Sequence, residues 1–109
     1  MRCEEAVLVR IFFGEDDKYE GKPLYKYLTE FCKSKGVAGV TVFRGILGYG
    51  QSSVIHKASL FKLSSDLPIV MEIVDCEEKI EKVLPEIAKM ISGGLITMEK
   101  VKVVRYDRP

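Results

Sequence analysis

The chain lacks tryptophan and asparagine altogether, and its only histidine is His56. With one imidazole and no C-x-x-C pair, neighbouring residues cannot supply the ligands of an ordinary zinc or copper site. We therefore expect neither a bound metal nor a resident cofactor. The 17 basic and 16 acidic residues leave a formal net charge of +1, so bulk charge gives no reason to expect a nucleic-acid partner.

Long hydrophobic runs are also missing. No apolar stretch reaches the roughly 18–20 residues of a membrane helix, and acidic residues, Glu4 and Glu5, stand where a signal peptide needs basic and then apolar ones. We expect a cytoplasmic protein. Its three cysteines, Cys3, Cys32 and Cys76, are far apart and odd in number, which favours free thiols in a reducing compartment.

The 109 residues are expected to form one domain, 1–109. Alternating or β-branched apolar residues predict four strands, over residues 6–13, 39–46, 67–75 and 95–106. The alternation of the last strand slips near Glu99 and Lys100, which predicts a bulge or a twist there. In the third strand, either Val70 and Val74 or the alternate set beginning with Ile69 faces away from the helices.

Apolar residues at helical spacing predict two helices, over residues 22–35 and 76–92. Gly36 is suited to end the first helix, and Asp75 is expected to cap the second. Pro85 lies inside the second helical pattern and is expected to kink or split that helix.

The predicted order is βαββαβ, which with right-handed crossovers gives a ferredoxin-like α+β sandwich. Its four-stranded antiparallel sheet carries both helices on one face. Every predicted strand has apolar residues on both sides, so the uncovered face must find a cover. We therefore expect the protein to form oligomers.

Glycines crowd the end of the second strand. Gly45, Gly48 and Gly50 lie within six residues, and successive amides in such a segment can cradle an anion. The alternative is a strand end that leads into a flexible loop. Arg44 beside them is suited to hold a phosphate or carboxylate, or is a solvated charge.

Two further features carry a functional and a plain interpretation. Gly93 and Gly94 are either a second place where backbone amides can approach an anion or an ordinary helix end. His56 lies in the long segment 51–65, where it either bonds a ligand, caps a turn or is solvated. Segments of that length are usually functional or mobile.

Together these segments resemble a known family. Gly48-Tyr49-Gly50-Gln51, a long loop and then the strand 67–74 (LPIVMEIV) are similar to the nitrogen-regulatory PII signalling proteins. A closer resemblance is to a PII-like family of uncharacterised proteins, classed as a domain of unknown function. It is carried by residues 43–50, 55–56, 63–68 and 93–97, and covers nearly the whole chain.

The resemblance implies a homotrimer with a small anionic ligand, first among them an adenine nucleotide, between subunits. It also implies that the T-loop-like segment 51–65 contacts a partner, such as a membrane transporter or an enzyme. The residues expected to bind the ligand are Arg44, Gly45, Gly48, Tyr49, Gly50, Gln51, His56, Gly93, Gly94, Lys100, Lys102 and Arg105.

The sequence departs from PII at several positions. Leu95 follows the glycine pair where PII carries a lysine for phosphates, and the basic residues near the end of the chain are loose counterparts. Segment 51–65 holds no tyrosine, so uridylylation is not expected.

Other functions are weighed against the residues available. A ligand-free interaction module that regulates a transporter or enzyme is the alternative function. An acylphosphatase needs an asparagine, which the chain lacks, and an RNA-recognition sheet needs aromatics that the strand 67–75 lacks. We expect that the protein is not an enzyme.

Overall fold

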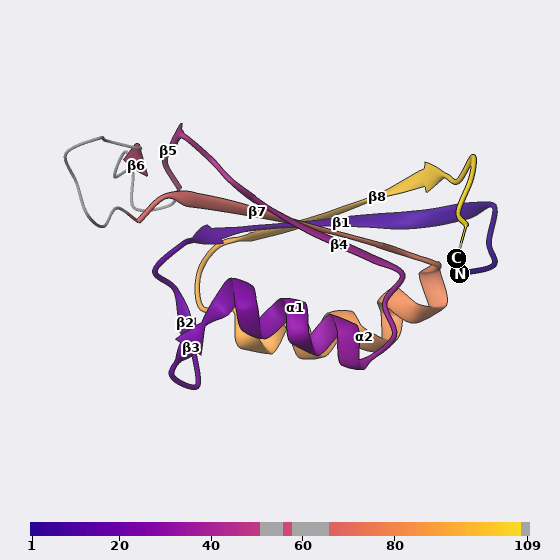
Figure 1. Cartoon of the computed structure of the whole chain (residues 1–109), viewed down its shortest axis with the longest axis horizontal. Helices are drawn as coiled ribbons and strands as arrows, with labels where there is room; N and C mark the ends of the chain where they lie inside the picture. Colours follow the sequence, from indigo (N-terminus) through magenta and orange to yellow (C-terminus); the bar gives the residue numbers. More distant parts are fainter. Residues whose placement is uncertain (51–55, 58–65, 108–109) are drawn as a thin grey trace.

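The computed structural model describes residues 1–50, 56–57 and 66–107 of the chain. Its main feature is one antiparallel sheet of four strands in the order β4-β7-β1-β8. The strands are β1 (Glu5–Gly14), β4 (Gly39–Arg44), β7 (Pro68–Asp75) and β8 (Leu95–Lys102). Both helices, α1 (Leu24–Ser34) and α2 (Glu77–Met90), cover the same face of this sheet, and Figure 1 shows them together below it. This is the ferredoxin-like arrangement that the sequence predicts.

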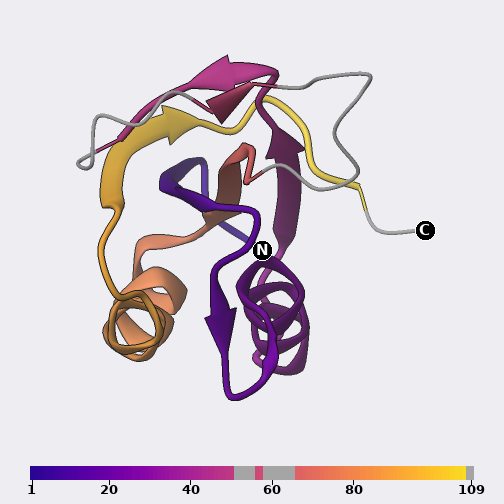
Figure 2. The same ribbon diagram turned by 90° about the vertical axis from the view of Figure 1, so that its left-hand side faces the viewer.

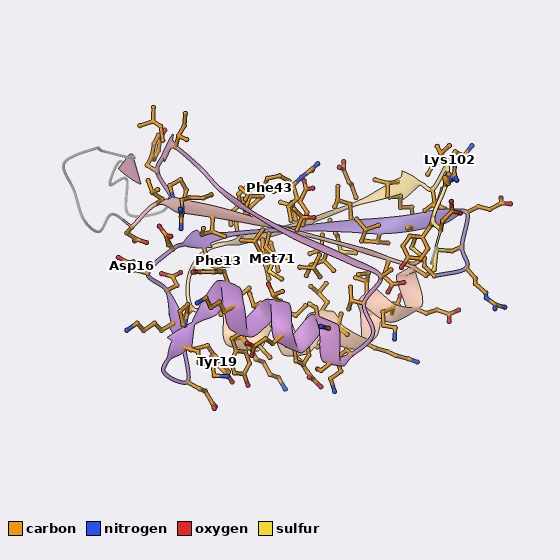
Figure 3. The ribbon with its side chains drawn as sticks, viewed as in Figure 1. Phe13, Asp16, Tyr19, Phe43, Met71 and Lys102 are labelled. Atoms are coloured by element: carbon orange, nitrogen blue, oxygen red, sulfur yellow. A yellow bond between two sulfur atoms is a disulfide. The ribbon has the colours of Figure 1, made fainter. Side chains whose placement is uncertain are left out.

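The core lies between the sheet and the helices, as the end-on view of Figure 2 shows. Alternate residues of the two central strands point into it, including Ile11 of β1 and Met71 of β7. The helices add Leu28 and Ile80, also almost fully buried. In Figure 3, Met71 lies on the helix side of the sheet and Phe43 on the other side. Period-two alternation in the strands and period 3.6 in the helices therefore meet in one apolar layer.

Two short hairpins flank the sheet. The strands β2 (Lys18–Tyr19) and β3 (Lys22–Pro23) pair across Glu20 and Gly21, whose φ angles are 51° and 79°. Positive φ at both central residues is the geometry of a type I′ turn. Helix α1 therefore begins at Leu24, two residues later than predicted. The second hairpin joins β5 (Leu47–Gly48) to β6 (His56–Lys57), so the long segment is not entirely without strand structure.

Both edge strands are shorter than predicted. Strand β4 ends at Arg44 rather than Ile46, because the partner strand begins at Pro68, which has no amide hydrogen to continue the ladder. Strand β8 ends at Lys102 rather than Tyr106, because β1 begins at Glu5 and offers no further strand to pair with.

Of the alternatives predicted from the sequence, the bulge in β8 and the split of α2 are wrong. The pairing of β8 with β1 runs without interruption from Leu95 opposite Phe12 to Lys102 opposite Glu5. Helix α2 is one helix that contains Pro85, whose ring lies on the exposed side. Water can satisfy the backbone groups that a proline frees at such a position. Among the described residues, no helix is long and apolar enough to cross a membrane.

The expectation of three free thiols is wrong for two of the cysteines. Cys3 and Cys76 form a disulfide, whereas Cys32 is a buried free thiol. The pair meets because Val7 of β1 lies opposite Asp75 of β7, which brings the residues just outside those strands together. Sequence spacing does not reveal such a pairing.

Asp75 is not the cap of α2, because the N-cap residue is Cys76. The buried Asp75 carboxylate instead accepts two backbone N–H groups, one from Cys76 at 2.6 Å and one from Ala38 at 2.9 Å. It therefore joins the start of α2 to the segment that leads into β4.

Candidate functional site

The glycine turn, residues 45–50, leaves the end of β4 and packs on Pro68. The Gly45 amide donates to the Pro68 carbonyl at 2.6 Å. A Cβ built on Gly45 would lie 2.8 Å from Pro68 Cγ, and one on Gly48 would lie 3.3 Å from it, whereas a Cβ on Gly50 would meet open space. Close packing therefore requires Gly45, and its amide is already used inside the chain rather than free for an anion.

Arg44 lies at the mouth of this turn, and its guanidinium pairs with the Glu15 carboxylate. The segment that carries Glu15 is hydrogen-bonded to the two residues just before β7. The Glu15 amide donates to the Leu67 carbonyl at 2.8 Å, and the Asp16 amide donates to the Asp66 carboxylate at 2.9 Å. An anion that binds Arg44 therefore competes with a carboxylate that the backbone holds in place.

The hairpin β5–β6 brings the predicted histidine to the glycine turn. His56 lies opposite Gly48 in the pairing of the two strands. Three apolar side chains of the turn are widely exposed, with Ile46 at 79%, Leu47 at 63% and Tyr49 at 71%. Gln51 lies outside the described residues. In Figure 1 this hairpin lies at the end of the sheet opposite the two chain termini.

The glycine pair Gly93–Gly94 lies at the same end of the sheet but at its other edge. Leu95, which follows the pair, opens β8 opposite Phe12 of β1. Both glycines have positive φ, 80° and 120°, and a Cβ on Gly94 would lie 2.5 Å from the Phe12 carbonyl oxygen. Because β4 and β8 are separated by two strands, the pair lies roughly 14 Å from the glycine turn.

The predicted basic residues lie at the far end of β8. Lys100 approaches Glu5 at 3.7 Å, and Arg105 pairs with Asp107 at 2.6 Å. Figure 3 shows Lys102 beside the chain termini. The eight-residue strand spans roughly 23 Å between its first and last residues, so one chain does not bring these residues to the glycine turn.

The uncovered face of the sheet is apolar at its edges and charged at its centre. Phe43 of β4 and Leu95 of β8 are 50% and 56% exposed, with Val70 and Phe12 between them in one cross-strand row. In the central row, Arg10 donates to Glu72 and to Glu99, each at 3.0 Å. These bonds, first that to Glu72, raise the pKa of Arg10. Of the two sets left open for β7, the face is therefore the one with Val70 and Val74.

Sequence analysis missed Glu15 and Pro68 as parts of this region. Glu15 belongs to no motif of the sequence, and Pro68 enters only as part of the segments that carry the resemblance. Their roles depend on which strands are neighbours, since Arg44 and Glu15 are 29 residues apart. No local pattern signals such a pair.

Known proteins match this chain over most of its length. The family DUF190, described as Uncharacterized ACR, matches residues 6–103. A UPF0166 protein of Aquifex aeolicus is 53% identical over 104 residues, which cover 95% of this chain and 98% of that protein. A UPF0166 protein of Methanocaldococcus jannaschii is 38% identical over 104 residues, or 94% and 95% of the two chains.

A solved structure shows the same fold at low identity. It is CPII, a nitrogen regulatory PII-like protein from Thiomonas intermedia K12, bound to ADP, AMP and bicarbonate. It superposes with a TM-score of 0.62 at 18% identity, over 93% of this chain and 90% of CPII. The chain thus shares its fold with a PII-like protein, and it belongs to the uncharacterised DUF190 family.

Proposed function

We propose that this protein is a non-catalytic, PII-like regulatory protein that binds a small anionic ligand, first an adenine nucleotide, between the subunits of a homotrimer. The observation that carries the proposal is the separation within one chain of two half-sites. Arg44 and the glycine turn lie at one end of the sheet, and Lys100, Lys102 and Arg105 lie at the other. A second copy can supply the missing half, so the complete site forms at an interface between copies.

Electrostatics supports a shared site. Within one chain the Arg44 guanidinium is already paired with Glu15, and Asp16 and Asp66 lie close by. These acidic surroundings alone attract anions poorly. Basic groups from a neighbouring copy would reverse the local charge and let a phosphate displace Glu15 from Arg44. The CPII neighbour, described with ADP and AMP bound, supports a nucleotide as the ligand.

The uncovered sheet face supports the assembly. Its exposed row from Phe43 to Leu95 is apolar, and removing that row from water on association would stabilise the trimer. The central ion pairs of Arg10 with Glu72 and Glu99 would fix how the copies are aligned. The assembled protein should sediment near 37 kDa, about three times the 12.3 kDa chain.

The hairpin β5–β6 is proposed as the contact to a partner protein. Ile46, Leu47 and Tyr49 are exposed together where segment 51–65 begins, and aromatic and aliphatic anchors of this kind commonly carry partner binding. This observation also favours the second candidate function, a ligand-free interaction module that regulates a transporter or an enzyme through the same segment.

Calorimetric titration of ADP into the purified protein tests the ligand. Arg44→Ala should weaken binding by about tenfold or more, because a charge-assisted hydrogen bond is lost. Glu15→Gln should strengthen it, because the competing carboxylate is removed while the side chain keeps its size. Lys26→Ala, which alters an exposed lysine of α1, is the matched control and should bind as the wild type does.

The two candidate functions differ in outcome. If none of ADP, AMP and ATP binds or raises the melting temperature, the nucleotide proposal is wrong. The interaction module then remains, and it predicts that deletion of residues 51–65 abolishes capture of the partner. If Arg44→Ala and Glu15→Gln change affinity in the same direction, the glycine turn is not the anion site.

A further inference from the structure

The disulfide between Cys3 and Cys76 lies at the end of the sheet opposite the glycine turn. Cys3 precedes β1, and Cys76 is the N-cap of α2, 73 residues later. Neither residue is fully buried. Both line a surface groove together with Arg2 and four glutamates, Glu5, Glu77, Glu78 and Glu81. A soluble thiol can therefore reach the bond, and the groove around it is negatively charged.

The remaining cysteine cannot take part. Cys32 is 0% exposed in the core under α1, and burial raises the pKa of its thiol to about 11. A protonated, inaccessible thiol neither attacks a disulfide nor exchanges with one. The chemistry is therefore confined to Cys3 and Cys76.

The bond anchors a segment that in turn holds the carboxyl-terminal residues. Next to Cys3, the Glu4 carbonyl accepts the Val103 amide at 2.8 Å, and Glu5 pairs with Lys102 in the sheet. Beyond Val103 the chain runs to Tyr106, whose hydroxyl donates to the Ala38 carbonyl at 3.3 Å. These contacts hold Lys102 and the residues on both sides of Arg105, and Lys102 and Arg105 are two of the predicted ligand-binding groups.

We propose that Cys3 and Cys76 form a reversible redox site for cationic thiols and dithiols, whose state sets the order of residues 102–107. A thiolate of the reductant attacks Sγ of Cys3, a new S–S bond forms, and the Cys3–Cys76 bond breaks. The electron pair leaves on Sγ of Cys76, which then takes up a proton from the solvent. The second thiolate of a dithiol then releases Cys3, so two electrons and two protons pass from the dithiol to the pair, and the dithiol becomes a cyclic disulfide.

The charge of the groove is tested by comparing two monothiols, cationic 2-aminoethanethiol and anionic 2-mercaptoethanesulfonate. Cleavage of the disulfide is followed by mass spectrometry after rapid alkylation, and rates are expressed per thiolate. At low salt the cationic thiol should react about tenfold faster or more, and high salt should shrink the difference. A triple variant, Glu77→Gln, Glu78→Gln and Glu81→Gln, should remove most of the difference in rate between the two thiols. Equal rates in the wild type at low salt would overturn the proposal, as would a protein that forms no Cys3–Cys76 bond in a glutathione redox buffer.

Amide hydrogen exchange in the full chain tests the coupling. Reduction should speed exchange at Val103 about threefold to tenfold, which corresponds to the net loss of one backbone hydrogen bond. The Gly45 amide, which donates to the Pro68 carbonyl at the other end of the sheet, should change less. The double variant Cys3→Ser, Cys76→Ser should match the reduced wild type, and Cys32→Ala should keep the oxidised pattern. An unchanged Val103 rate, or equal acceleration at Gly45, would overturn the proposal.

A consequence for the ligand rests on the proposed function, since a loosened Lys102 and Arg105 should hold an anion less well. ADP should then bind the reduced protein more weakly than the oxidised protein. The exchange measurement uses no nucleotide. A protein that binds no ADP in either state therefore refutes the proposed function, whereas an unchanged Val103 rate refutes the redox coupling alone.

Discussion

Replacement of Gly94 by alanine gives the sharpest test of the backbone that leads into β8. Gly94 has a φ of 120°, and a Cβ there would lie 2.5 Å from the carbonyl oxygen of Phe12. Real Cβ atoms do not approach a backbone oxygen so closely, so either β1 or the start of β8 must shift. Both are strands of the same ladder, since Leu95 pairs with Phe12, and a shift disturbs their pairing.

The magnitude follows from two separate costs. An L-residue held at an unfavourable positive φ costs about 1–3 kcal/mol. Relief of the steric overlap costs about another 1–3 kcal/mol, as for other overpacked sites. We therefore expect Gly94→Ala to lower the free energy of unfolding by about 2–6 kcal/mol. For a chain of 109 residues this corresponds to a loss of roughly 8–24 °C in melting temperature, at about 4 °C per kcal/mol.

Thermal denaturation followed by circular dichroism measures this loss, with Gly50→Ala as the matched control. Gly50 lacks a positive φ, and a Cβ there meets no atom within 4 Å. The control should therefore lie within about 0.5 kcal/mol of the wild type. If both variants melt together with the wild type, the close approach of Gly94 to Phe12 is wrong.

Three further predictions concern other parts of the molecule. Reduction of the Cys3–Cys76 bond, which closes a separation of 73 residues, should lower the free energy of unfolding in urea by about 4 kcal/mol, and an equal midpoint for oxidised and reduced protein would contradict this. Burial raises the pKa of the Cys32 thiol from 9.0 to about 11, so the contribution of the protonated thiol to the free energy of unfolding is complete below pH 9 and is lost as the pH rises through 11. Urea unfolding at increasing pH should show this loss in the wild type relative to Cys32→Ala, and an equal pH dependence in the two proteins would refute it. Phe43→Asp should convert the sedimenting trimer to monomers, whereas Lys33→Asp on the exposed side of α1 should not, and an intact trimer in Phe43→Asp would move the interface elsewhere.

The sequence carries most of the fold because its patterns are local. The spacing of Val9, Ile11 and Phe13 places them on one face of a strand, and the structure shows that this face of β1 meets the helices. The residues at which the edge strands end were less predictable than the faces of the strands. Where β4 stops depends on Pro68 in a different strand, and the apparent slip of β8 reflects its position at an edge rather than a bulge.

The candidate site was only partly predictable, because its contacts join distant segments. The spacing of Arg44 and the glycines predicts an anion site there, which stays a prediction, and the structure adds that His56 is paired with Gly48. It does not reveal that Glu15 neutralises Arg44, or that Cys3 meets Cys76, because both pairs depend on the order of strands in the sheet. It also does not reveal that Lys100 and Lys102 lie at the end of the sheet opposite the glycine turn.

The central claim is that the two halves of the anion site come from different copies, and ADP binding to mixed assemblies tests it most directly. Arg44→Ala and the double variant Lys102→Ala, Arg105→Ala should each bind ADP weakly when alone. After the two proteins exchange subunits at equal concentrations, about a quarter of the subunit interfaces in a trimer should combine the intact half-site of one variant with the intact half-site of the other. Those interfaces should regain wild-type affinity for ADP. If mixing restores no tight binding, both halves of the site lie in one chain or the site is elsewhere, and the account is contradicted.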